Sequence, residues 1–309
     1  MNLQQLTYLV ALDTHRSFGL AAEKSFVTQP ALSVQVQKLE DELGVLLFDR
    51  NKKGAEPTAV GMKVIAQARQ VLREAQQLRE LVQVEKGEMV GELRLGVIPT
   101  LAPYLVPRFL VGLTTAYPQL QVRVEELRSE EIMVQLKDHR LDVGLLVTPL
   151  DDRQLRELPV LEEPFLTYVS ANHPLAGKAQ IEAADLKAPG MWLMQQGHCF
   201  RHQVLNLCAA TTDPNAHVTY ESGSIETLME LVRRHQGYTL VPELAVLNEV
   251  DTNPLVKRFV NPQPVREVSL VVHHGFVRVP LLTALRQLIL ESVPERLWAG
   301  QSGAKVRWR

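Results

Sequence analysis

The 309-residue chain contains only two cysteines, Cys199 and Cys208, and both lie in the segment GHCFRHQVLNLC. His198 precedes Cys199 and Arg201 follows two positions after it, and cationic neighbours favour the thiolate, which is the reactive form of cysteine. Residues 200–207 are predicted to form a short helix, which would place Cys199 at its positive N-terminal end. Cys199 is therefore predicted to be an activated thiol. The leucine and alanine neighbours of Cys208 predict an unreactive, buried one.

The spacing of the two cysteines limits what they can do together. If the segment is helical, their nine-residue separation spans roughly 13 Å, whereas a disulfide needs its Cα atoms within about 7 Å of each other. A bond between the two sulfurs would therefore require the helix to unwind, which is the behaviour of a redox switch. Two alternatives stay open, namely a pair of structural core cysteines and a metal site formed by His198, Cys199, His202 and Cys208. The spacing is not a standard zinc pattern, so we expect no metal ion and no cofactor.

Composition indicates the broad class of protein. A chain with 46% apolar residues can bury more than one core, and a net charge of −2 does not by itself indicate nucleic-acid binding. The N-terminus lacks a basic segment followed by an apolar run, and no apolar stretch reaches about 18 residues, so we expect neither a signal peptide nor a membrane span. The protein is therefore expected to be cytoplasmic, where a disulfide would be transient and regulatory.

Residues 1–58 are predicted to form a winged helix-turn-helix domain. Helical spacing of apolar residues predicts a first helix over residues 2–12, Ser17 can cap a second, and Thr28 can cap a third with Pro30 in its first turn. The apolar residues that this third helix turns inward are Leu32, Val36 and Leu39. The polar residues that it turns outward, toward a major groove, are Gln29, Ser33, Gln35, Gln37 and Lys38. Phosphate-binding charge at the tip of the predicted hairpin wing comes from Arg50, Lys52 and Lys53.

Five motifs in this domain carry a resemblance to a known family. The runs SFxxAA, TQPALS, KLEDELG, LFxR and PTAVG strongly resemble the winged helix-turn-helix of LysR-type transcriptional regulators, over about the first sixty residues. The resemblance implies that double-stranded operator DNA is a partner. It also implies that Thr28, Gln29, Pro30, Ser33 and Lys38 lie at the DNA, with Arg50 and Thr58 near phosphate.

Residues 59–87 are predicted to form a long helix that dimerises. No proline interrupts this stretch, and six small or apolar residues recur at spacings of four and three, which is the period of a coiled coil. These residues are Val64, Ala68, Val71, Ala75, Leu78 and Val82. The sequence itself predicts a homodimer, which agrees with the family, and the resemblance implies a homotetramer with RNA polymerase as a candidate partner.

Residues 88–300 alternate predicted strands and helices, which is typical of an α/β sensor domain. A late return of strand and helix predicts two subdomains with crossing connections, like a periplasmic binding protein: subdomain I over 88–163 and 265–300, and subdomain II over 164–264. The whole chain is thus predicted to be an α+β multidomain protein with a ligand cleft between the two lobes. Short strands are expected at residues 191–194 and 217–221, and the last residues are expected to form a loose tail.

Motifs in the sensor domain narrow the resemblance to the peroxide-sensing branch of the LysR-type family. They are IPTLAPYL, MxxGHCxRxQ with a later cysteine, SxETL and TLVPxLAV. This resemblance implies that Cys199 is the peroxidatic cysteine and Cys208 the resolving one. It further implies that Thr100, Ser129 and His198 help to bind peroxide and that Arg266 holds the reduced form. His202 and Ser129 depart from the acidic residue and the threonine expected at these positions.

The resemblance therefore predicts a hydrogen-peroxide-sensing LysR-type transcription regulator, an activator in oxidative stress, switched by a Cys199–Cys208 disulfide, and not an enzyme. One alternative is a LysR-type regulator that binds a small-molecule effector in the interlobe cleft. A second is a thiol peroxidase, against which the winged helix argues.

Overall fold

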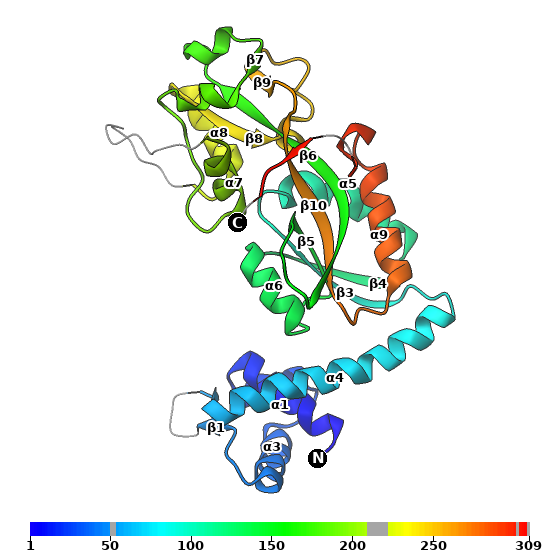
Figure 1. The fold of residues 1–309 in the computed structure, drawn as a ribbon. Coiled ribbons are helices and arrows are strands. Elements are labelled where there is room, and N and C mark those ends of the chain that lie inside the picture. Colours follow the sequence, from blue (N-terminus) through cyan, green and yellow to red (C-terminus); the bar gives the residue numbers. More distant parts are fainter. Residues whose placement is uncertain (50–53, 209–221, 301–302, 308–309) are drawn as a thin grey trace. The chain divides into compact units, whose positions relative to one another are not determined.

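The computed structural model describes residues 1–49, 54–208, 222–300 and 303–307, except for the side chain of Cys208. The chain divides into two compact units, residues 1–88 and 89–309, which are described separately below (Figure 1). The predicted basic residues Arg50, Lys52 and Lys53 and the predicted strand at 217–221 lie outside the described residues. No helix of the described part is both long and apolar enough to cross a membrane.

The first unit is the predicted winged helix-turn-helix. Its elements are α1 (Leu3–His15), α2 (Phe18–Lys24), α3 (Gln29–Leu43), the hairpin strands β1 (Phe48–Asp49) and β2 (Glu56–Pro57), and α4 (Ala59–Glu85). Thr28 caps α3 through a bond from the Ala31 amide, and Gly44 ends it in the left-handed conformation. Leu32, Val36 and Leu39 are buried as predicted, which confirms the orientation of this helix.

A buried carboxylate joins α3 to the wing. Glu40 Oε1 accepts hydrogen bonds from the amides of Leu47 (2.7 Å) and Phe48 (3.2 Å), at the point where β1 begins. Thr58 fixes the other side of the hairpin, because its hydroxyl donates to Leu46 O and accepts from the Gly61 amide, both at 2.9 Å. The observed role of Thr58 is therefore to cap α4 within the chain.

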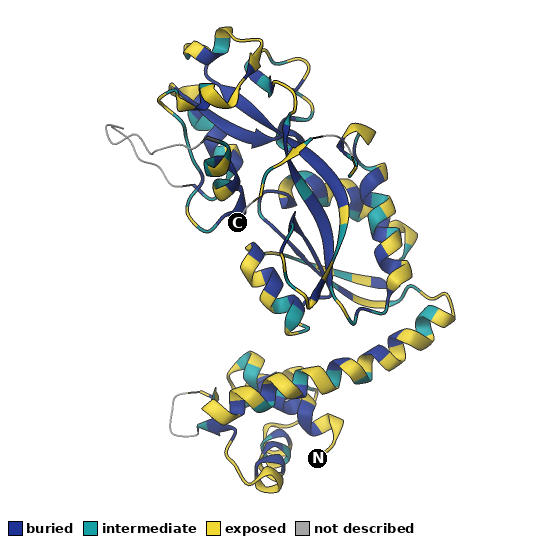
Figure 2. Cartoon of the chain, viewed as in Figure 1, coloured by how far each residue is buried: buried dark blue, intermediate teal, exposed yellow. Residues whose placement is uncertain are grey.

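The predicted seam of α4 falls into two parts. Ala68 is buried in the core of the first unit and Val64 packs against that core, so these two side chains are occupied within the chain. Val71, Leu78 and Val82 are exposed, and 68% of the Leu78 surface is accessible. Figure 2 shows many exposed residues along α4. From Val71 onward, the predicted seam therefore offers an exposed apolar edge.

The second unit is built on one nine-stranded sheet. Its strands are β3 (Gly91–Val97), β4 (Leu120–Glu126), β5 (Val143–Thr148), β6 (Leu155–Val169), β7 (Gln180–Ile181), β8 (Tyr238–Pro242), β9 (Val256–Phe259), β10 (Pro264–His273) and β11 (Ala304–Lys305). The main path runs β4-β3-β5-β10-β6-β9-β7, with β8 beside β6 and β11 beside β10. The helices of this unit are α5 (Ala102–Ala116), α6 (Ser129–Lys137), α7 (Cys199–Cys208), α8 (Ile225–Arg234) and α9 (Val279–Glu291).

The long strand β6 passes through both lobes of this unit (Figure 1). Its residues up to Pro164 pair with β10, and from Phe165 onward they pair with β8. One apolar core contains residues of 93–161 and 268–297, and the other contains residues of 165–259. This arrangement confirms the predicted fold class, in which a helix-turn-helix domain is followed along the chain by an α/β sensor with two lobes.

Two local predictions for this unit were wrong. Residues 191–194 form two isolated bridges and no strand, because their partners, Tyr238 and Ser222, lie on different segments of the chain. The C-terminal residues are not a loose tail, because Ala304 and Lys305 pair with β10 as β11.

We predict that Gly61→Ala destabilises the first unit. A Cβ atom at this helical position would lie 2.0 Å from the Leu47 carbonyl oxygen, and backbone cannot yield as a side-chain end can. We expect a loss of about 1–3 kcal/mol in the free energy of unfolding, measured by urea denaturation.

The matched control is Gly112→Ala in α5, where the new Cβ would meet only Leu288 Cδ2 at 3.4 Å. There the better helix propensity of alanine should leave stability unchanged or raise it by up to about 1 kcal/mol. Equal effects of the two substitutions would contradict the close approach of α4 to the wing.

Candidate redox site

Cys199 is the first residue of α7 and lies where the two lobes meet. It is buried, with 7% of its surface exposed, among the apolar residues of the first lobe. The next residue, Phe200, belongs to the core of the second lobe. Gly197 turns the chain into the helix with a φ of +88°, and a Cβ atom there would lie 2.8 Å from the Arg128 guanidinium. The helix predicted around the cysteines is thus confirmed, with Cys199 at its N-terminal end.

Arg266 is the charged group at the centre of this site. It is completely buried on β10 and donates from Nε to Glu163 Oε2 (2.8 Å), from Nη1 to Thr100 Oγ1 (2.8 Å) and from Nη2 to Thr100 O (3.0 Å). Its guanidinium carbon also lies 5.4 Å from the centroid of the Phe200 ring, within the range of a cation–π interaction. One side chain therefore joins three segments that are distant in sequence.

The thiol of Cys199 is subject to opposing influences. Burial raises the pKa of Cys199, while the hydroxyl of Ser129 and the positive charge of Arg266 lower it. The Ser129 interaction is weak, since its buried Oγ has no hydrogen-bond partner within ordinary distance and angle limits. The thiol is thus held protonated by burial, and Arg266 is the cation that favours its ionisation.

The two cations predicted to activate the thiol have other hydrogen-bond partners in the structure. Burial, and then the charge of Arg128, lower the pKa of His198, which favours its neutral form. Its Nε2 lies 3.3 Å from Gln195 Nε2. Arg201 donates to the Met194 carbonyl oxygen at 2.5 Å, and this contact holds the loop before α7.

Thr100 and Arg266, which the resemblance placed at the thiol site, are directly hydrogen-bonded to each other. The prediction that Cys208 is buried concerns a side chain outside the described residues. Of the four proposed metal ligands, His202 is exposed. Within the described ranges, no cluster of histidine, cysteine and carboxylate side chains could hold a metal ion.

The residue that the sequence prediction missed is Glu163. Its buried carboxylate pairs with Arg266 at 2.7 Å and also accepts a bond from the Leu244 amide (2.8 Å) of the second lobe. Burial raises the pKa of Glu163, and the neighbouring Arg266 lowers it. Two adjacent glutamates inside an otherwise apolar strand were the available signal, because a carboxylate placed in a core needs a partner.

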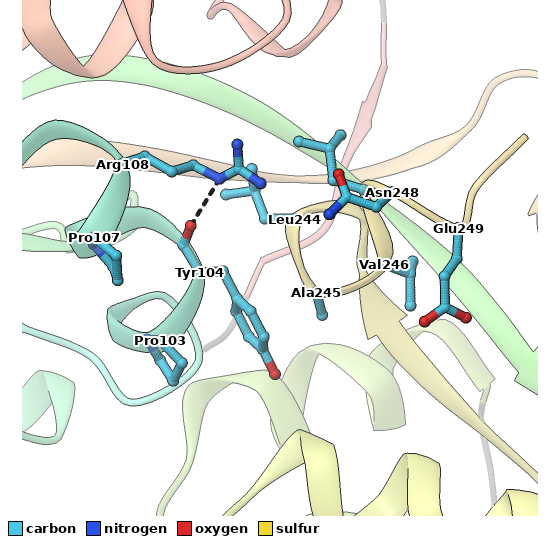
Figure 3. A pocket seen from close by; sticks show the side chains of 10 residues that line it. Pro103, Tyr104, Pro107, Arg108, Leu244, Ala245, Val246, Asn248 and Glu249 are labelled. Atoms are coloured by element: carbon cyan, nitrogen blue, oxygen red, sulfur yellow. Dashed lines mark hydrogen bonds between the residues drawn. The ribbon is translucent and has the colours of Figure 1, made fainter.

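A separate pocket of about 370 Å³ lies between the start of α5 and the turn after β8, and so between the two lobes (Figure 3). Arg108 Nε donates to the Tyr104 carbonyl oxygen on one wall, and the residues of the turn form the other wall. Its lining consists of Pro103, Tyr104, Pro107, Arg108 and residues 244–249. Cys199 does not belong to this lining, so the pocket and the thiol site are distinct.

Most of the predicted DNA-contacting residues belong to α3 or to its cap. Gln29, Pro30 and Lys38 are exposed, while Ser33 and Gln35 are half-buried. Thr28 is exposed and its hydroxyl caps the helix. The described part of α3 therefore presents a polar face beside a buried apolar one, as the winged helix-turn-helix prediction requires.

Two protein-family models match this chain. Residues 3–62 match the model of the bacterial regulatory helix-turn-helix protein, lysR family, and residues 86–294 match that of the LysR substrate binding domain. The chain belongs to the LysR-type family of transcriptional regulators. Members of this family are regulators and not enzymes, so the thiol peroxidase alternative does not apply to this LysR-type chain.

Several relatives of this LysR-type regulator carry names that mention peroxide. The chain is 38% identical over 278 residues to a "Hydrogen peroxide-inducible genes activator" of Haemophilus influenzae, covering 89% of this chain and 91% of the relative. It is 36% identical over 290 residues to the "DNA-binding transcriptional dual regulator OxyR" of Escherichia coli, covering 93% of each. Both matches extend through the two units of the chain.

Solved structures show the same likeness. A full-length OxyR from Pseudomonas aeruginosa with a cysteine-to-aspartate substitution has a TM-score of 0.79 at 36% identity, covering 94% of this chain and 97% of that one. A cysteine mutant of OxyR from Corynebacterium glutamicum, bound to hydrogen peroxide, has a TM-score of 0.62 at 27% identity, covering 94% and 92%.

We predict that Arg266→Met destabilises the protein by about 3–5 kcal/mol at neutral pH, because it leaves Glu163 buried without its partner. Without Arg266 the folded pKa of Glu163 lies above its unfolded value. Protonation then stabilises the folded state at low pH, and this contribution is lost as pH rises through the folded pKa. The deficit relative to the parent protein should therefore be smaller at about pH 5 than at about pH 8 in urea denaturation.

The control is the double variant Arg266→Met, Glu163→Gln, which has no ionisable group at this position. Its stability deficit should be smaller than that of the single variant and should not change with pH. A single variant whose deficit is independent of pH would show that Glu163 does not depend on Arg266.

Proposed function

We propose that this LysR-type regulator senses hydrogen peroxide at Cys199 and answers with a change in DNA binding. The observation that carries the proposal is the position of Cys199, buried at the start of a helix under the charge of Arg266, with the hydroxyls of Thr100 and Ser129 in the same site. Relatives that match most of the chain are named for peroxide-inducible genes, which supports the same ligand.

The chemistry follows from the groups around the sulfur. Arg266 favours the thiolate against the effect of burial, and the thiolate attacks one peroxide oxygen, breaking the O–O bond and forming a sulfenic acid while the other oxygen leaves as water. The Cys208 thiolate then attacks the sulfenic sulfur and releases a second water. The two thiols are oxidised to one disulfide, and the peroxide is reduced to two waters.

The helix makes this reaction a conformational switch. The cysteines are the first and last residues of α7, so their Cα atoms are separated by roughly 13 Å, beyond the reach of a disulfide. Sulfenic acid is also more polar than the thiol that the apolar site of Cys199 holds. Oxidation therefore favours departure of the cysteine from its site and unwinding of the helix.

The DNA response requires an oligomer. The exposed apolar edge of α4, with Val71, Leu78 and Val82, is suited to a partner helix, and family resemblance favours a homodimer that associates into a tetramer. Rotation of paired heads would change the spacing of their contacts on operator DNA and with it the access of RNA polymerase. Such a regulator acts on DNA in the cytoplasm.

A second candidate function rests on the pocket of Figure 3, which could hold a small-molecule effector between the lobes. Titration of free thiols after an equimolar dose of peroxide distinguishes the two candidate functions. Loss of both thiols supports peroxide sensing, and retention of both supports an effector.

The central prediction is an asymmetry between two variants. Cys199→Ser should abolish the peroxide response, because it removes the nucleophile. Cys208→Ser should still form sulfenic acid at Cys199, which dimedone traps for detection by mass spectrometry. It should not form the disulfide that stabilises the oxidised conformation. DNA footprints before and after peroxide report the response. If peroxide still changes the footprint of the Cys199→Ser protein, the proposed mechanism is wrong.

We predict two different effects on DNA binding from the exposed face of α3. Gln29→Ala should cost about 1–3 kcal/mol on the preferred operator if the amide contacts bases. Lys38→Ala should weaken binding to every sequence and flatten its salt dependence if the ammonium meets phosphate. Fluorescence anisotropy at several salt concentrations measures both.

The matched control is Lys86→Ala, which also removes one lysine charge. Lys86 lies at the C-terminal end of α4, roughly 40 Å along that helix from its first residue. It should leave affinity and salt slope close to those of the parent protein. Unchanged binding in the two α3 variants would rule out the proposed DNA face.

A further inference from the structure

Residues 303–307, here named the C-terminal strap, are held against β10. Ala304 and Lys305 pair in parallel with Pro264 and Val265, through bonds from the Ala304 amide to Gln263 O and from the Val306 amide to Val265 O, both at 2.8 Å. The ammonium of Lys305 forms ion pairs with Glu267 and with Glu162, the latter at 3.2 Å. The strap is therefore a strand of the sensor sheet.

In addition to pairing with β10, the strap contacts α7, the helix that carries both cysteines. Gln203 is completely buried and donates from Nε2 to Val306 O at 2.8 Å. Asn206, on the same face three residues later, donates from Nδ2 to Arg307 O at 2.9 Å. Val306 also packs against the apolar core of the second lobe. Two successive carbonyls of the strap thus accept bonds from one face of α7.

These bonds depend on the helical form of α7. A three-residue spacing brings the two amide side chains to one face only while the segment is helical. Unwinding would separate them and leave the Gln203 amide without its partner, and a buried polar group without a partner is costly. The strap therefore favours the helical state and opposes the unwinding that joins Cys199 to Cys208.

The strap and the thiol site also share a strand. Val265, which pairs with Lys305, directly precedes Arg266, whose charge acts on Cys199. The strand β10 thus positions Arg266 near the first residue of α7, and through its pairing with the strap it positions the carbonyls of Val306 and Arg307 beside the later turns. Contacts along α7 therefore depend on β10 at both places.

We propose that the C-terminal strap sets the threshold of the redox switch, with Gln203 and Asn206 as positioning residues that keep the two cysteines apart. This inference rests on the proposed function, because the step that it slows is the attack of the Cys208 thiolate on the Cys199 sulfenic acid, with release of water. Loss of the strap accelerates that step and stabilises the disulfide form.

The test compares the full chain with a variant that ends after residue 302, and with Gln203→Met, which keeps the side-chain length but has no donor. Arg307→Ala is the matched control, since it changes the tail side chain but retains the carbonyl that Asn206 contacts. In the reduced proteins, hydrogen exchange of the α7 amides should rise about tenfold in both strap variants and stay unchanged in the control.

The same proteins then receive peroxide. In both strap variants the Cys199–Cys208 disulfide should form about tenfold faster, and its equilibrium with a dithiol buffer should shift about tenfold toward the disulfide, which makes the reduction potential about 30 mV more negative. If the truncated chain does not fold, as judged by circular dichroism, Gln203→Met and Asn206→Ala decide the result by the same measurements.

Two failures are distinguishable. If the full chain forms no Cys199–Cys208 linkage, the proposed function is wrong, while the exchange measurement still tests the contact between strap and helix. If the full chain forms the linkage but the strap variants match Arg307→Ala in exchange, rate and potential, the strap does not set the threshold and the inference is overturned.

Discussion

The buried ion pair between Arg266 and Glu163 is the interaction on which the sensor unit depends. Both side chains are fully enclosed, so each charge requires the other. Arg266 extends the pair to Thr100 at the start of α5, and Glu163 extends it to the Leu244 amide of the second lobe. A pair with these additional bonds has its remaining hydrogen-bonding groups engaged, which is the condition under which a buried salt bridge is tolerated. The lobes are thus held together by a polar contact with a defined geometry.

Under the proposed function, this ion pair also accounts for a cysteine that is buried and yet reactive. Burial by itself raises the pKa of Cys199 and protects the thiol from indiscriminate oxidation. The charge of Arg266 acts in the opposite sense and favours the thiolate when a small oxidant reaches the sulfur. Because Arg266 stacks on Phe200, the residue after the thiol, a displacement of Cys199 would disturb the surroundings of the same cation. Sensor chemistry and lobe packing therefore share one group.

The helix α7 is held at both of its ends by the same strand. Its first residue lies under the charge of Arg266 on β10, and its later turns bond to the strap that pairs with β10. A short helix has little stability of its own, so tertiary contacts decide whether it persists. Such marginal, contact-dependent stability is suited to an element that unwinds in the proposed reaction.

The local elements and the class of the protein could be predicted from neighbouring residues and motifs. The caps of α2 and α3, the inward face of α3, the helix of the cysteine segment and the alternation of the sensor domain all follow from neighbouring residues, and motif resemblance supplied the family. Motif resemblance had already named Thr100, Ser129 and Arg266 at the thiol site. The tertiary structure added the pairing of Arg266 on β10 with Glu163 on β6, and it gives His198 and Arg201 partners other than the thiol. The role of the C-terminal residues was likewise decided by pairing with a strand about forty residues earlier. Local sequence fixes backbone preferences over a few residues, but burial and charge pairing are set by segments that meet only when the sheet has formed.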